Sequence, residues 1–139
     1  MTRELEKIQT LDPFQLLQAL GEGVYGMDCD GRSTFINAAA ERMLGWKAGD
    51  LLGKGLHGLV HHSHLDGTPF DVADCPIHGV LKAGETARVD ADVFWTKTGD
   101  PVRVEYVATP IFDDAKVITG VVVAFRDVTE ELRARRQAE

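Results

Sequence analysis

Three segments of alternating apolar and polar residues in the C-terminal third of the chain constrain the fold most. They cover residues 86–96, 102–112 and 117–126. Two short polar connectors, 97–100 and 113–115, separate them and have the composition of hairpin turns. Alternation with a period of two predicts β-strands that bury one face. The sequence therefore predicts an antiparallel meander that runs directly into the last residues of the chain.

The alternation also predicts which side chains of the meander face the core. The expected inward residues of its first two strands are Val89, Ala91, Val93 and Trp95, followed by Val102, Val104, Tyr106 and Ala108. The charged residues between them, namely Arg88, Asp90, Asp92, Arg103 and Glu105, are expected on the opposite face. We expect Trp95, Tyr106 and Phe125 either to line a cavity or to fill it. Filling is favoured, because aromatic residues at strand spacing usually form core.

The N-terminal half is predicted to contain a hairpin and several short helices. Strands 24–28 and 33–36 flank a turn at Gly31. Helices are expected from Asp12 to about Leu20 and over residues 38–44, 48–52 and 72–83, whereas 56–69 is assigned mostly to loop. Residues 1–10 either extend the first helix or remain loose. The fold class is therefore α+β, with a five-stranded antiparallel sheet, short helices on one face and flanking helices at both ends.

The last strand is apolar at nearly every position from Val117 to Phe125, which predicts a central strand that is covered on both faces. The first helix offers a matching apolar stripe, formed by Phe14, Leu17 and Leu20. This helix, from the same chain or from a partner chain, is expected to cover the outer face of the last strand. On this ground the sequence predicts a homodimer.

Composition narrows the classes of function. The chain has 139 residues and a net charge of −7 at pH 7, which disfavours binding to nucleic-acid phosphates. It has no apolar run long enough to span a membrane. The start of the sequence lacks the features of a signal peptide, so a cytoplasmic location is predicted.

Two passages resemble the PAS family. Residues 35–46, Phe-Ile-Asn-Ala-Ala-Ala-Glu-Arg-Met-Leu-Gly-Trp, are similar to its passage of strand, Asn, short helix and Leu-Gly-aromatic. Residues 125–130, Phe-Arg-Asp-Val-Thr-Glu, resemble its terminal strand and the junction that follows. A third passage, 66–70 together with 75–77, looks like a subgroup attached to bacterial kinases and phosphatases. The resemblance implies a flanking helix over 1–21, a PAS domain over 22–128 and the start of a signalling helix over 129–139.

The resemblance implies a sensory module that regulates an effector such as a histidine kinase, a phosphatase or a cyclase, usually as a homodimer. PAS domains enclose a pocket between the sheet and a helix, which holds haem, flavin, a small metabolite or nothing. The pocket residues expected here are Ile77, His78, Leu81, Val93, Trp95, Val104, Tyr106 and Phe125. The expected signal junction is Asp127, Thr129 and Glu130. A dimerisation scaffold with a filled core is the alternative, and no particular cofactor is indicated.

Local chemistry gives Asp127 a role of its own. Its carboxylate can accept from the amides that open the last helix, and Glu130 is spaced to complete a capping box. The simplest interpretation is a cap alone. The functional interpretation adds that a small change of free energy at this joint biases the position of the output helix.

Five histidines and Cys75 lie between the two groups of strands. The histidines are His57, His61, His62, His64 and His78. Their spacing matches no usual zinc motif, so no metal site is predicted, and exposure in a loop accounts for most of them. His78 occupies a helix on which haem-binding PAS domains can place an axial ligand. Cys75 does not fit the flavin-photosensor motif and is expected to be buried. No nucleophile elbow, oxyanion loop or carboxylate pair accompanies it, so no catalytic residue is predicted.

Overall fold

The computed structural model describes residues 12–138, and the predictions for residues 1–11 lie outside this range. The N-terminal half contains α2 (Pro13–Ala19), β1 (Gly23–Asp28), β2 (Ser33–Ile36), α3 (Ala38–Leu44), α4 (Ala48–Leu51) and α5 (His57–Val60). The remainder contains the 3-10 helix η1 (Val72–Asp74), α6 (Pro76–Ala83), β3 (Ala87–Trp95), β4 (Pro101–Phe112), β5 (Ile118–Asp127) and α7 (Thr129–Ala138).

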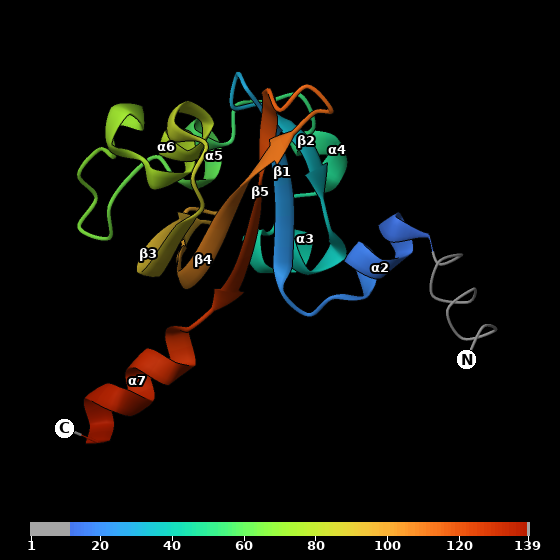
Figure 1. The fold of residues 1–139 in the computed structure, drawn as a ribbon. Helices are drawn as coiled ribbons and strands as arrows, with labels where there is room; N and C mark the ends of the chain where they lie inside the picture. The colour runs from blue at the N-terminus through green and yellow to red at the C-terminus, as the bar shows by residue number, and fades with distance from the viewer. Residues whose placement is uncertain (1–11, 139) are drawn as a thin grey trace.

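The five strands form one antiparallel sheet in the order β2-β1-β5-β4-β3. This confirms the predicted α+β class and the central position of the last strand. Figure 1 shows α3 behind β1, whereas α2 lies beside the sheet and α7 projects from the end of β5. Within the described residues, no helix has the length and apolar character needed to cross a membrane.

The predicted helix over 72–83 is corrected, and the segment assigned mostly to loop contains one short helix. The segment predicted as one helix over 72–83 is divided into η1 and α6, because Cys75 precedes a proline and adopts an extended conformation with ψ 122°. The segment 56–69 contains α5, a four-residue helix that brings His57 and His61 close to the core. The glycines and turn residues around α5 concealed this single helical turn from pattern analysis.

A β-bulge in β3 reverses the side chains that face the core. Val89 pairs with Tyr106 of β4 and Asp92 pairs with Val104, so three steps along β3 match two along β4. Directly opposed residues share a face, and one extra residue therefore turns the rest of β3 over. Phe94 is fully buried beyond the bulge. The predicted inward direction of Val93 and Trp95 is wrong, because the pairing places Asp92 and Phe94 on the core face. Val93 is nevertheless buried, at 4% exposure, on the opposite face.

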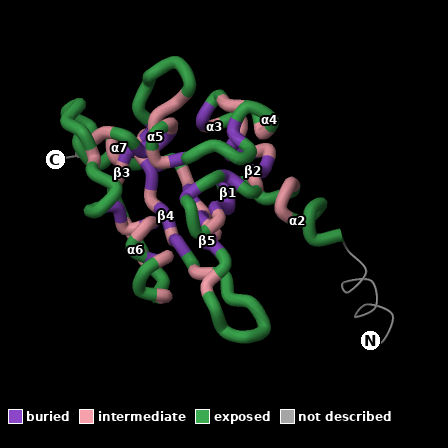
Figure 2. Tube along the Cα trace, turned by 90° about the horizontal axis from the view of Figure 1, so that it is seen from above, coloured by how far each residue is buried: buried purple, intermediate pink, exposed green. Residues whose placement is uncertain are grey.

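The core lies on the inner face of the sheet, between the strands and helices α3 to α6. Fully buried side chains from separate elements meet there, including Tyr25 of β1, Phe94 of β3 and Phe125 of β5. The ring centroids of Phe94 and Phe125 are 5.0 Å apart, and those of Tyr25 and Phe125 are 6.0 Å apart. In Figure 2 the buried segments follow the strands, whereas α2 contains only intermediate and exposed residues.

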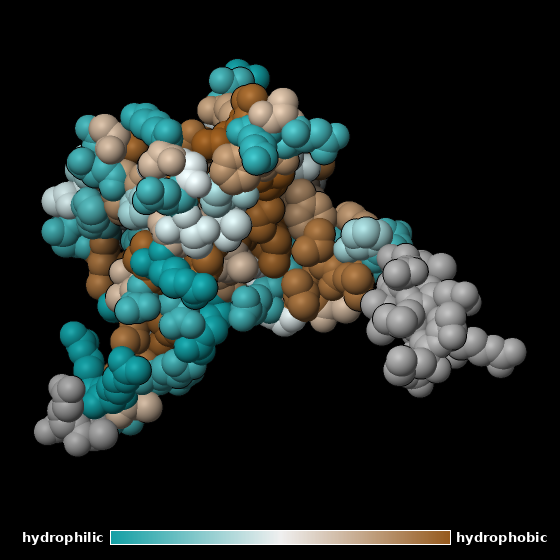
Figure 3. Space-filling view, viewed as in Figure 1, coloured by the Kyte–Doolittle hydropathy of each residue, from teal (hydrophilic) through white to brown (hydrophobic). Residues whose placement is uncertain are grey.

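The outer face of the sheet carries an apolar row that we call the outer strip. Its members are Phe35, Val24, Val122, Ala124 and Val107, which the strand pairing places on one face of β2, β1, β5 and β4. Figure 3 shows hydrophobic side chains gathered over β1 and β5 and next to α2. Val122 and Ala124 of β5 remain partly exposed. The central strand therefore has one face in the core and one face that is incompletely covered.

Candidate functional site

The predicted pocket residues fall on both sides of the sheet. Ile77, Val104, Tyr106 and Phe125 are buried in the core, and Leu81 packs against them. His78 is partly buried on α6. Val93 and Trp95 lie on the other face, where the Trp95 indole Nε1 donates to the Ser63 carbonyl at 2.8 Å and the ring stacks on His62. The structure therefore brings together the predicted pocket residues that face the core. The bulge places the other two, Val93 and Trp95, on the opposite face.

Aromatic rings fill the space that the inward residues surround. Phe94 stacks on Tyr106 with 5.5 Å between ring centroids and meets Phe125 edge-on. Tyr25 is tilted against both Phe94 and Phe125. These contacts support core packing as the role of Tyr106 and Phe125. Their role in ligand binding stays a prediction.

A buried polar cluster adjoins this aromatic core. The His61 ring is 1% exposed, and its Nε2 lies 2.8 Å from Asp92 Oδ2. Its Nδ1 lies 3.3 Å from the sulfur of Cys75, which is 3% exposed. Cys75 is buried as predicted, but the expectation that the histidines lie in an exposed loop is wrong for His61. The bulge in β3 turns Asp92 inward, where its carboxylate pairs with the His61 ring.

The contact between His61 and Asp92 determines the charge of each side chain. Burial by itself lowers the pKa of His61, but the hydrogen bonds to Asp92 and Cys75 outweigh burial and raise the pKa to about 9. Burial likewise raises the pKa of Asp92, but the His61 hydrogen bond outweighs it, so this pKa lies below its usual value. In the metal-free protein at neutral pH, His61 is therefore protonated and Asp92 is ionised.

Two further histidines border the cluster. The Nε2 of His57 lies 2.7 Å from the Phe70 carbonyl oxygen. Its Nδ1 is buried without a hydrogen-bond partner among residues 12–138, and the same holds for Nε2 of His78. The two rings are 5.6 Å apart. Burial lowers the pKa of both His57 and His78, which favours neutral imidazoles with a free lone pair.

The cluster has limited access for substrates. Cys75, His61 and Asp92 have the order of nucleophile, base and orienting acid that hydrolases use. A nucleophile must meet a substrate carbonyl, however, and the Cys75 side chain lies beneath the surface. Burial thus makes nucleophilic attack on an external substrate unfavourable. The grouping was missed from the sequence because its members come from α5, the start of α6 and the bulge of β3.

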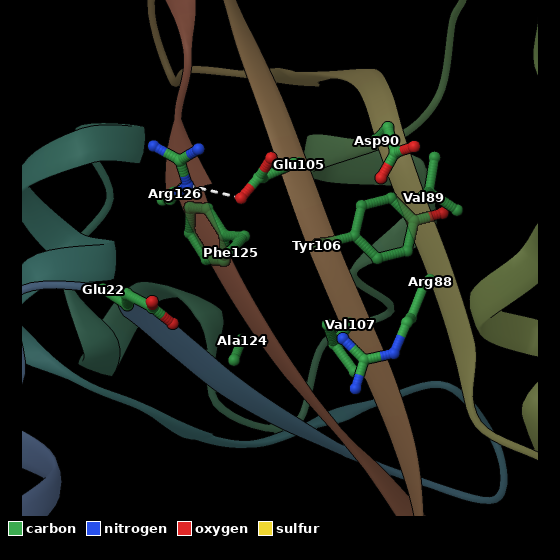
Figure 4. Close-up of a pocket in the computed structure, with 10 residues that line it drawn as sticks. All are labelled: Glu22, Arg88, Val89, Asp90, Glu105, Tyr106, Val107, Ala124, Phe125 and Arg126. Carbon is green, nitrogen blue, oxygen red and sulfur yellow. Dashed lines mark hydrogen bonds and ion pairs between the residues drawn. The ribbon is translucent and has the colours of Figure 1, made fainter.

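The outer face of the sheet carries a charged groove next to the outer strip. Figure 4 shows Arg126 of β5 directed to Glu105 of β4, with Arg88 and Asp90 of β3 nearby. Arg126 and Glu105 form an ion pair. Both are partly exposed, so the groove is a hydrated surface of mixed charge. Sequence alternation predicted the outward direction of Glu105 correctly.

The junction between β5 and α7 is tied to β4 by backbone and side-chain contacts. Asp127 Oδ1 accepts from the Thr129 amide at 2.8 Å, which agrees with its predicted capping interaction. The Val128 amide donates to the Arg103 carbonyl at 2.8 Å. Glu130 instead accepts from Arg133 at 3.2 Å, so the predicted capping box is incomplete. The helix begins one residue later than a box starting at Asp127 requires.

Arg126 connects the sheet to the output helix. Its guanidinium donates to Glu105 on β4 and to Glu131 on the first turn of α7. The Glu131 hydrogen bond raises the pKa of Arg126, and the same contact lowers the pKa of Glu131. This bridge was not predicted, because Glu105 and Glu131 are 26 positions apart in the sequence and reach Arg126 only through strand pairing and the start of α7. Arg126 thus contacts both β4 and α7.

The residues proposed for dimerisation remain accessible on α2. Phe14 and Leu20 are exposed, Leu17 is half-buried, and Phe14 meets Phe35 of the outer strip edge-on at 5.8 Å. Figure 1 shows α2 beside the β2 edge of the sheet rather than across β5. The predicted cover of β5 is therefore not supplied by this helix within the chain.

Comparisons with known proteins agree with this geometry. The family described as "PAS fold" matches residues 11–128. Probable diguanylate cyclase DgcE of Escherichia coli (strain K12) is 30% identical over an alignment of 126 residues, and the match covers 87% of this chain. The match covers 11% of the length of that relative.

Solved structures share the fold at lower sequence identity. The PAS domain of nitrogen regulation protein NR(II) from Vibrio parahaemolyticus has 21% identity and a TM-score of 0.65, with 85% of this chain and 99% of that one covered. A PAS domain from Colwellia psychrerythraea has 16% identity and a TM-score of 0.70, and the match covers 91% of this chain and 98% of that one. An RNA-binding Light-Oxygen-Voltage receptor has 18% identity and a TM-score of 0.73, and the match covers 99% of this chain and 37% of that one. At these identities the likeness shows the fold alone.

Proposed function

Because the chain belongs to the PAS family, we propose that it is a sensory and regulatory module that binds a small ligand or a protein partner and acts on an effector through α7. The observation that most directly supports this proposal is the bridge from Glu105 through Arg126 to Glu131. This bridge and the Asp127 cap together link two strands of the sheet to the first turn of the output helix. A ligand that shifts β4 against β5 would bias the position of α7.

The proposed effector is a signalling enzyme. One relative of the chain is a probable diguanylate cyclase, and one structural neighbour belongs to a nitrogen regulation protein. We propose a cyclase, a histidine kinase or a phosphatase, on the same polypeptide or on a partner. The chain itself acts as the regulator, with no catalytic residue assigned. The cytoplasmic location stays a prediction.

The proposed assembly is a homodimer through α2 and the outer strip. Phe14 is 54% exposed although its ring contacts Phe35, so α2 and the strip form a continuous apolar surface. A second α2 packed over Val122 and Ala124 would cover the open face of β5. Burial of apolar surface at about 25 cal/mol per Å² supplies the driving force.

Charge reversal on α2 tests this assembly. We expect the double variant Phe14→Glu and Leu20→Glu to shift the mass in light scattering from dimer to monomer, because the carboxylates lose hydration in the interface. Leu52→Glu is the matched control, since Leu52 is similarly exposed and lies at the C-terminal end of α4, outside α2 and the outer strip. A wild-type chain that is monomeric at all accessible concentrations would refute the dimer.

The Asp127 cap gives a test of coupling. Asp127→Ala removes the acceptor of the Thr129 amide, which costs about 1 kcal/mol of local helix stability. We expect amide exchange in α7 to become about fivefold faster, with the sheet unchanged. In the full-length protein, the same variant should lose the response of the effector. Asp12→Ala is the control, because Asp12 caps α2 in the same way.

Ligand binding is tested on the freshly purified chain by absorption and native mass spectrometry. A coloured band or an added mass that is lost on denaturation supports a bound ligand. A colourless chain with no added mass, and with no shift in melting temperature across a metabolite panel, favours the scaffold alternative.

A further inference from the structure

We propose that His57, His61 and Cys75 form a binding site for a thiophilic transition-metal ion, with Zn²⁺ as the preferred ion. One ligand atom from each of these residues lies within 4.8 Å of the others. The proposal concerns metal binding by this domain and stands whether or not the domain regulates an effector.

The separation of the donors fits a tetrahedral ion. Zinc binds imidazole nitrogen at about 2.0–2.1 Å and thiolate sulfur at about 2.3 Å, which places neighbouring ligand atoms about 3.3–3.8 Å apart. The observed distance from His61 Nδ1 to Cys75 Sγ is 3.3 Å. An ion can therefore be placed between these atoms with small side-chain rotations. The His57 ring centroid lies 5.4 Å from that of His61, close enough to supply the third donor.

Two acceptors orient the histidines for this role. His61 Nε2–H donates a hydrogen bond to Asp92 Oδ2, and His57 Nε2–H donates one to the Phe70 carbonyl oxygen. Both rings therefore direct Nδ1 away from these partners, and in His61 Nδ1 faces the sulfur. A carboxylate or carbonyl on the outer nitrogen is the usual support of a metal-bound histidine. The bulge in β3 supplies the carboxylate, so the fold builds the support as well as the ligands.

Unpaired nitrogens are the second independent observation. Within residues 12–138, His57 Nδ1 and His78 Nε2 are buried and have no hydrogen-bond partner. Native proteins pair most buried polar atoms, so two such nitrogens on adjoining rings call for an explanation. Coordination accounts for His57 Nδ1. The fourth position of the ion is open to water or to His78 Nε2, whose ring adjoins that of His57.

The donor set also indicates the kind of metal. Two imidazoles and one thiolate suit Zn²⁺ and other thiophilic ions, whereas Mg²⁺ and Ca²⁺ prefer oxygen ligands. A divalent ion would be balanced by the Cys75 thiolate and the Asp92 carboxylate. The protons held by the Cys75 sulfur and by Nδ1 of His61 would leave as the metal binds. Phe70 and His57 are only partly buried, so the proposed site lies close to the surface.

Cobalt titration of the metal-free chain is the direct test. We expect about one Co²⁺ per chain, a near-ultraviolet charge-transfer band from the thiolate, and loss of both when Zn²⁺ is added in competition. Cys75→Ser should remove the band. Cys29→Ser is the matched control, because Cys29 is the other free cysteine and lies exposed outside the cluster.

Variants of the histidines and of Asp92 separate ligation from folding. His57→Gln should weaken Zn²⁺ binding at least tenfold, whereas His62→Gln, at an exposed neighbouring position, should leave it unchanged. Asp92→Asn should weaken it about 10- to 100-fold through loss of the supporting carboxylate. Circular dichroism checks that each variant is folded. No stoichiometric Co²⁺ band in the wild type, or a band that survives in Cys75→Ser, would overturn the proposal.

Alkylation gives a readout that does not depend on colour. Bound Zn²⁺ should slow iodoacetamide modification of Cys75 and leave that of Cys29 unchanged, as measured by peptide mass spectrometry. Because Cys75 is buried, the rates are compared at a mild urea concentration at which the metal-free chain is measurably alkylated at this residue. Equal rates at Cys75 with and without saturating Zn²⁺ under these conditions would contradict ligation by its sulfur.

Discussion

Phe94→Ala is expected to lower the free energy of unfolding by about 3–5 kcal/mol, the usual cost of deleting a buried aromatic side chain. The Phe94 ring is fully buried and contacts Tyr25, Tyr106 and Phe125. Its removal leaves a cavity that rings from several strands cannot easily close. Urea unfolding monitored by circular dichroism measures the change.

The adjacent residue provides the control for this prediction. Trp95→Ala should cost about 1–2 kcal/mol, because the indole is partly exposed and loses one hydrogen bond and one stacking contact. Without a bulge, alternation along β3 would place Trp95 inward and Phe94 outward, and Trp95→Ala would then lose more stability than Phe94→Ala. A larger loss for Trp95→Ala than for Phe94→Ala would therefore argue against the bulge between Val89 and Asp92.

Asn37→Ala is expected to lower the free energy of unfolding by about 3 kcal/mol, the sum of a lost helix cap and of buried groups left unpaired. Asn37 is fully buried, and its Oδ1 accepts from the amides of Val24 and Ala40. Its Nδ2 donates to the carbonyls of Leu17 and Glu22. One amide side chain thus joins α2, β1 and α3.

Two variants distinguish capping from this wider role. Asp71→Ala removes an exposed cap that, among the residues that the structure describes, accepts from Ala73 alone, and should cost about 1 kcal/mol or less. Asn37→Asp keeps the acceptor oxygen but replaces the two N–H donors, so it should remain clearly destabilising near neutral pH. A loss for Asn37→Ala no greater than for Asp71→Ala would show that the contacts of Nδ2 add little.

The elements with strong local signals could be predicted from the sequence. The cap at Asn37 and the left-handed Gly45 define α3 almost to the residue, because both are local backbone requirements. The alternation of β4 from Val102 to Ala108 was read correctly, since its pairing with β5 is regular over that stretch. The central place of β5 followed from its apolar character on both faces.

The candidate metal site was hidden from the sequence for a physical reason. Metal motifs are recognised by close spacing on one turn or helix, whereas His61 and Cys75 are 14 residues apart and Asp92 follows another 17 residues later. They meet only because α5, α6 and the bulged strand pack on the same part of the core. The Gly-rich context of α5 gave no sign that His61 would be buried.

The sequence by itself determined the order of the strands, the antiparallel meander and the helix caps at Asp12 and Asn37, because these depend on residue periodicity and on backbone groups a few positions apart. Tertiary structure decided which face of β3 enters the core, since one extra residue between Val89 and Asp92 inverts every side chain beyond it. That inversion buries Phe94, turns Asp92 to His61 and moves Trp95 to the other face. Alternation specifies two faces of a strand, and only packing against the other strands and helices selects the one that is buried.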